Sequence, residues 1–117
     1  MKVFISQPMR DKTNEEIKNE RDIAIYLIKR RFPDEDVEII DSFFEGAPHE
    51  AKPLWFLGES FKKLADADLA YFARGWEEYR GCKMENMAAK EYGIDVIEEE
   101  KASDGIIPKF IKANKED

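Results

Sequence analysis

One stretch near the N-terminus decides the fold: KVFISQPMRDKTNEE, residues 2–16. It begins with a β-rich apolar run that stops at Gln7-Pro8, which is typical of a strand buried on both faces and ended by a proline. Thr13, followed three residues later by Glu16, is a capping box, so a helix begins there. The stretch predicts a central strand that leads through a short loop into a helix.

The rest of the chain continues this alternation of strands and helices. Apolar periodicity and turn residues predict that the first helix runs to residue 32, with strands over 37–40, 69–73 and 94–97, helices over 54–66 and 81–92, and loops over 41–53 and 74–80. Such an order implies parallel strands joined by right-handed crossovers. We therefore expect an α/β three-layer sandwich with a doubly wound, flavodoxin- or Rossmann-like parallel sheet of strand order about 2-1-3-4.

The length of 117 residues fits one domain, which we place over residues 1–111, with a charged and disordered tail over 112–117. Apolar residues at 106, 107, 110 and 111 predict one more short element docked before that tail. We see no signal peptide and no apolar run long enough to span a membrane, and Cys82 is alone, so we expect a cytoplasmic protein.

The charge balance limits the partners. With 19 basic and 26 acidic residues the net charge is −7, which disfavours binding to duplex nucleic acid but allows a small anionic ligand. One histidine and one cysteine cannot build a structural zinc site, so we expect no metal and no cofactor.

Ligands of doubly wound sheets bind outside the carboxyl ends of the strands, where the strand order reverses. Here that point brings together the loops over 6–13 and 74–80. The first loop runs into a helix N-terminus, which favours an anion, and Arg10 with Ser6 could complete a phosphate site. Its candidate binding residues are Ser6, Gln7, Pro8, Met9 and Arg10. The alternative is a plain turn with a solvated Arg10.

The second loop and the helix after it contain polar and aromatic groups, of which Glu85 matters most. It lies about one turn into the helix, where backbone amides ahead of it are expected to stabilise its ionised form. A carboxylate at the rim of a crevice is a competent nucleophile for attack at a sugar carbon. The other candidates for binding here are Gly75, Trp76 and Gly81. From spacing alone, an ordinary surface glutamate is the simpler interpretation.

Three segments carry a resemblance to a known family: MKVFISQPMRDKT (1–13), LADADLAYF (64–72) and RGCKMENMAA (80–89) followed by Tyr92-Gly93. Over nearly residues 1–97 the chain resembles the nucleoside 2-deoxyribosyltransferase-like superfamily, and it is most similar to a small branch with an Ile-Ser-x-Pro-Met N-terminus. In that superfamily a Gly-x-x-x-Glu motif before an alanine-rich helix supplies the nucleophile. The motif matches Gly81 to Glu85.

The resemblance implies cleavage or transfer at the N-glycosidic bond of a deoxynucleoside or its 5′-monophosphate, through a covalent sugar ester on Glu85. It also implies that the first loop holds the 5′-phosphate and that the protein is a homo-oligomer. Where relatives carry acidic helper residues, this chain has Ser60, with Glu59 beside it, and Tyr79. A non-catalytic nucleotide-binding or sensing module that uses the same crevice is therefore the alternative.

Several other residues allow two interpretations each. Trp76 and Tyr79 could close the pocket or serve subunit contacts. The aromatic residues Phe43, Phe44 and Trp55 could line the pocket or pack under the loop, and His49 could be an acid or base or an ordinary loop residue.

Cys82, at a helix start that lowers a thiol pKa, is a conceivable nucleophile. The acidic run at 98–100 is simplest as a solvated strand exit.

Overall fold

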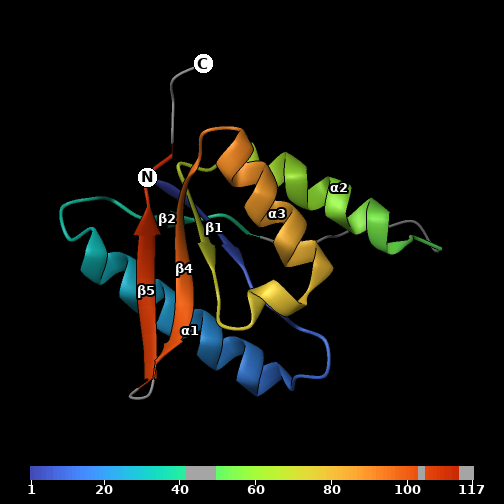
Figure 1. The fold of residues 1–117 in the computed structure, drawn as a ribbon, viewed down its shortest axis with the longest axis horizontal. Coiled ribbons are helices and arrows are strands. Elements are labelled where there is room, and N and C mark those ends of the chain that lie inside the picture. Colours follow the sequence, from blue (N-terminus) through green and yellow to red (C-terminus); the bar gives the residue numbers. More distant parts are fainter. Residues whose placement is uncertain (42–49, 103–104, 114–117) are drawn as a thin grey trace.

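The computed structural model describes residues 1–41, 50–102 and 105–113 (Figure 1). The elements in chain order are β1 (Lys2–Ser6), α1 (Asn14–Arg31), β2 (Glu38–Ile39), α2 (Pro53–Leu64), β3 (Leu69–Phe72), the 3-10 turn η1 (Trp76–Glu78), α3 (Arg80–Glu91), β4 (Asp95–Ala102) and β5 (Gly105–Ile111). The described strands form one sheet of order β2-β1-β3-β4-β5. The α/β class and the order of the first four strands are confirmed.

The expectation of a wholly parallel sheet is wrong at one edge. Strands β1 to β4 pair in parallel, but β5 runs antiparallel to β4, with Val96 opposite Ile111 and Glu99 opposite Pro108. This pairing extends β4 well beyond the predicted end at residue 97 (Figure 1). Pro108 is tolerated because β5 is an edge strand, whose outer side needs no N–H donor for a neighbour.

The ends of the helices follow the signals in the sequence. At the start of α1 the Thr13 hydroxyl accepts from the Glu16 amide over 3.1 Å, and Glu16 Oε1 accepts from the Thr13 amide over 3.2 Å. At the end of α3 the Ile94 amide donates to the Ala89 oxygen, and Gly93 takes a φ of +78°. Both the capping box and the C′ glycine are therefore confirmed.

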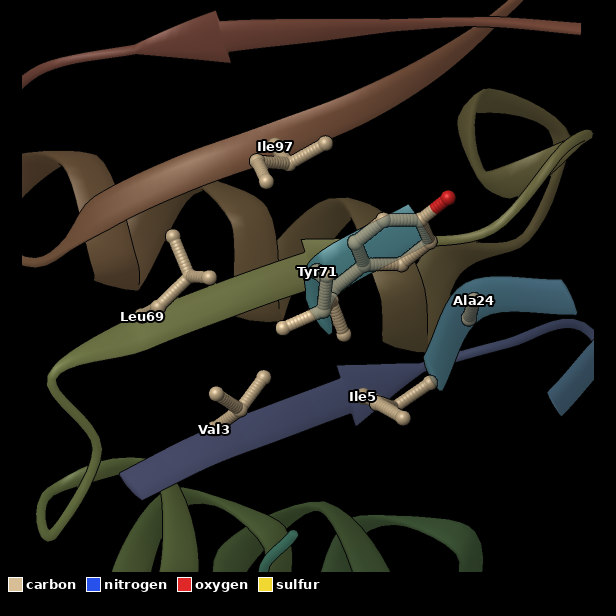
Figure 2. Packing of buried hydrophobic residues seen from close by; sticks show 7 residues of the cluster. Val3, Ile5, Ala24, Leu69, Tyr71 and Ile97 are labelled. Carbon is tan, nitrogen blue, oxygen red and sulfur yellow. The ribbon is translucent and has the colours of Figure 1, made fainter. Parts of the chain in front are cut away.

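Alternate strand residues pack against different helices. One buried cluster joins Ala24 and Ile28 of α1 to side chains of three strands, namely Val3, Ile5, Leu69, Tyr71 and Ile97. Figure 2 shows this cluster, with Ala24 of α1 facing the strand side chains. A second cluster joins Leu64 of α2 and Ala89 of α3 to Phe4, Ala70, Phe72 and Val96. In Figure 1, α2 and α3 lie side by side.

Beyond β5 the structure describes two more residues, 112 and 113. The Ala113 amide donates a hydrogen bond to Asp95 Oδ1 over 2.9 Å. Residues 114–117 lie outside the described residues. None of the helices in the described ranges combines the length and the apolar character that crossing a membrane requires.

Candidate functional site

The loops that follow β1 and β3 contact each other at the carboxyl ends of these adjacent strands. The Tyr79 hydroxyl donates to the Arg10 backbone oxygen over 3.3 Å, and the Arg10 guanidinium carbon lies 5.5 Å from the centre of the Tyr79 ring. Gly75 has a φ of +87°, and a Cβ there would lie 3.9 Å from Pro8 Cγ. The two loops expected at the switch point therefore lie side by side.

A cavity of about 590 Å³ opens where these loops meet α2 and α3. Its size is typical of a small-molecule site. Apolar side chains come from α2 and from the first loop, and charged side chains come from the first loop, from η1 and from α3. The lining residues are Gln7, Pro8, Met9, Arg10, Pro53, Phe56, Leu57, Ser60, Glu78, Tyr79, Arg80, Gly81, Cys82, Lys83 and Glu85.

Glu85 lines this cavity from the second turn of α3. Its side chain is buried, and the Ser6 hydroxyl at the end of β1 donates to Glu85 Oε1 over 2.9 Å. Ser60 of α2 also makes a side-chain hydrogen bond to Glu85. Three elements that are far apart in the sequence thus hold one carboxyl group at the cavity wall.

Burial raises the pKa of Glu85 above its ordinary value, and the hydrogen bonds from Ser6 and Ser60 oppose that rise. The expectation that backbone amides favour the ionised form is therefore wrong. Desolvation outweighs the two hydroxyl donors. In its ionised form the Glu85 carboxylate is a poorly solvated base in reach of a ligand, and in its protonated form it can donate a proton.

Cys82 lies beside Glu85 on the cavity wall, but its thiol is not activated. Burial raises the pKa of Cys82 to about 11, and the charge of Glu85 adds to the rise. Hydrogen bonding to Ser6 acts in the other direction and is weaker. The predicted lowering by the helix start is wrong, and the thiol is a poor nucleophile at neutral pH.

The first loop is built around a tight turn. The Lys12 amide donates to the Met9 oxygen over 3.2 Å, and Asp11 takes the left-handed φ of +64°. Gln7 is buried and its Nε2 donates to the Ile17 oxygen of α1, which fixes the loop to that helix. Arg10 and Met9 are exposed at the rim of the cavity.

Not every predicted site residue lines the cavity. Trp76 packs against Phe72 of the core, with ring centres 5.6 Å apart. The Lys90 ammonium nitrogen lies over the Trp76 ring, 5.9 Å from its centre. Glu59 forms an ion pair with Lys62 at 3.2 Å. Ser6 does not line the cavity, but its hydroxyl donates to Glu85, which does. The predicted residues Ser60, Tyr79 and Gly81 line the cavity.

Two buried carboxylates on β4 were missed from the sequence. Glu98 accepts from Asn86 Nδ2 over 2.8 Å and pairs with Lys90 at 2.7 Å. Glu99 accepts from the Tyr71 hydroxyl and from the Arg74 amide. The interpretation of 98–100 as a solvated exit is therefore wrong for Glu98 and Glu99, which attach α3 and the second loop to β4. A run of like charges gave no signal of this burial.

Of the aromatic and histidine residues predicted around the long loop before α2, the structure describes Trp55. Phe43, Phe44 and His49 fall outside the described residues, whereas Trp55 packs edge-on against Phe56 with ring centres 5.0 Å apart. Across residues 1–41, 50–102 and 105–113, no three His, Cys, Asp or Glu side chains gather in a way that could hold a metal ion.

The site thus combines a buried glutamate held by two hydroxyls, an apolar wall from α2 and a cationic rim. Comparison of the chain with protein-family models, with curated proteins and with solved structures found no match. Any function assigned to the chain therefore rests on this geometry and on the sequence motifs.

Proposed function

We propose that the chain is a nucleoside deoxyribosyltransferase-like N-glycosidase or transferase that acts on a deoxynucleoside or its 5′-monophosphate. The observation that carries the proposal is the buried Glu85 carboxyl at the wall of the cavity, with the Ser6 hydroxyl 2.9 Å from Oε1. The matching Gly81-x-x-x-Glu85 motif supports the same role for this residue.

In the proposed reaction a Glu85 carboxylate oxygen attacks C1′ of the sugar. The C1′–O bond forms while the C1′–N bond breaks, and the base leaves with the electron pair of that bond and takes up a proton from solvent water. A water molecule, or a second base, then attacks C1′ and loses a proton to solvent, the ester bond breaks, and the Glu85 carboxylate is regenerated. The hydroxyls of Ser6 and Ser60 orient the carboxyl group for both steps.

The apolar wall supports a planar ligand. Phe56 and Leu57 of α2 line the cavity together with Tyr79, and aromatic side chains are good partners for a base. The first loop, with Arg10 at the rim, is the proposed site of the 5′-phosphate. We infer the three-layer, Rossmann-like architecture from the two core clusters, of which one includes α1 and the other α2 and α3.

A nucleotide-binding module without catalysis is the second candidate, and one observation favours it. Burial keeps the pKa of Glu85 raised, which reduces the fraction of carboxylate available as nucleophile. Ser60 and Tyr79 also stand where the related proteins carry acidic helpers. In this function the same cavity binds the nucleotide and no bond is broken.

One experiment separates the two candidates. The purified protein is incubated with a panel of deoxynucleosides and their 5′-monophosphates, and free base is measured by chromatography. We expect base release that Glu85→Gln removes, while Glu91→Gln, which alters an exposed glutamate of α3 outside the cavity, retains it. Binding without any base release would support the module, and undiminished activity in Glu85→Gln would refute the role of that residue.

A further inference from the structure

Three cations gather at the rim of the cavity in a chain whose net charge is −7. Arg10 comes from the first loop, and Arg80 and Lys83 come from the first turn of α3; all three are exposed and line the same cavity. Among the residues that the structure describes, none of these three forms an ion pair with a carboxylate.

Tyr79 lies between the two segments that carry the cations. Its ring centre lies 5.5 Å from the Arg10 guanidinium carbon, and it directly precedes α3, whose first turn contains Arg80 and Lys83. Unpaired like charges around one cavity repel each other, even when water screens them. Such an arrangement is favourable when a ligand supplies several negative charges.

The opposing charge at the cavity is small. Glu78 is the exposed carboxylate among the lining residues, and Glu85 is buried and hydrogen-bonded by Ser6. The three cations therefore outnumber the exposed carboxylate of the lining, and they come from two separate segments, the first loop and α3, so they can contact more than one phosphate group of a ligand. The start of α3 adds amide donors, because no side chain caps this helix.

We propose that the rim binds a phosphate chain, so that the preferred ligand is a nucleoside 5′-di- or triphosphate rather than a monophosphate. Arg10 contacts the phosphate nearest the sugar, and Arg80 and Lys83 contact the phosphates beyond it. The nucleoside part of this assignment rests on the proposed function. The anion part rests on the cationic rim alone.

The test is calorimetric titration of the full chain at fixed ionic strength. The ligands are the 5′-mono-, di- and triphosphates of deoxyadenosine and thymidine, together with inorganic phosphate and pyrophosphate. The key variant is Arg80→Ala/Lys83→Ala. Its matched control is Lys29→Ala/Arg30→Ala, which removes the same charge from exposed residues in the last turn of α1.

We expect the wild type and the control to bind diphosphates at least about tenfold more tightly than monophosphates, since each charge-assisted hydrogen bond contributes that much. The key variant should lose this preference and keep its monophosphate affinity. Equal affinity of the wild type for mono- and diphosphates, or a preference that survives in the key variant, would overturn the proposal. Rim-dependent pyrophosphate binding with no nucleotide binding would uphold the anion site and refute the proposed function.

Discussion

The Ser6 hydroxyl donates a hydrogen bond to Glu85 Oε1 over 2.9 Å, and both residues are buried. Ser6 ends β1 and Glu85 lies in α3, so this bond ties the two segments that form opposite sides of the switch point. A hydroxyl has one proton to give, and here it goes to the carboxyl group. Because this contact exists only in the folded chain, the protonation of Glu85 is linked to the stability of the fold as well as to the chemistry of the site.

The first prediction concerns the pH dependence of stability. Because burial raises the pKa of Glu85 above 4.5, the native state binds this proton more tightly than the unfolded state does. The group therefore favours folding below its unfolded pKa, and that contribution is lost as the pH rises through the folded pKa. Glu85→Gln cannot ionise, so its stability relative to the wild type should increase from about pH 4 to about pH 7.

Urea unfolding of both proteins at the two pH values measures this difference. A stability difference that is the same at low and neutral pH would contradict a raised pKa for Glu85. Loss of folding in the variant at neutral pH would do so as well, because a neutral amide should be favoured in this buried position.

The second prediction concerns phosphate recognition by the first loop. Arg10 is exposed at the cavity rim, where a charge-assisted hydrogen bond to phosphate contributes about 1.5 to 3 kcal/mol. Arg10→Ala should therefore weaken monophosphate binding by roughly tenfold to a hundredfold and leave nucleoside binding nearly unchanged. Arg30→Ala, on α1, is the matched control. If the wild type binds a nucleoside and its monophosphate equally in calorimetry, the loop is only a turn.

The third prediction concerns the bond that anchors the second loop. The Tyr71 hydroxyl donates to Glu99, which also accepts from the Arg74 amide, and both side chains are buried. Tyr71→Phe leaves one carboxylate oxygen without that donor, so it should lower the free energy of unfolding by about 1 to 3 kcal/mol. Tyr26→Phe, at an exposed tyrosine of α1, should change it little. Equal effects of the two substitutions in urea unfolding would show that the Glu99 contact adds no stability.

Local signals in the sequence predicted what depends on neighbouring residues. The capping box of Thr13 and Glu16, the C′ position of Gly93 and the order of the first four strands follow from such signals and from crossover rules. The meeting of the loops over 6–13 and 74–80 followed from strand order, because the carboxyl ends of β1 and β3 lie side by side.

What the sequence did not predict depends on distant partners. The apolar residues at 106–111 predicted a short docked element but not a strand antiparallel to β4, and the place of β5 at the edge of the sheet is what allows Pro108 within it. Glu98 and Glu99 looked solvated because their partners, Asn86 and Tyr71, are remote in the sequence. The raised pKa of Glu85 likewise results from burial by three elements that meet only in the folded chain.

The last prediction concerns self-association through α2 and α3. Leu54 is 76% exposed and Tyr92 is 86% exposed. Leu54 and Met84 line one apolar hollow of about 610 Å³. Tyr92 lines another of about 490 Å³ with Phe61. Exposed apolar side chains of this kind are typical of an interface, and we propose that a two-fold contact between copies of the chain buries them.

Light scattering at micromolar concentration should give at least twice the monomer mass of 13.7 kDa. Leu54→Glu should shift the protein towards the monomer, because it places a charge in the proposed contact, whereas Tyr26→Glu on α1 should not. Trp76 packs against Phe72 of its own core, so it is not expected to reach the site of the other copy. A monomeric wild type would refute the contact and leave the α2–α3 surface exposed to solvent.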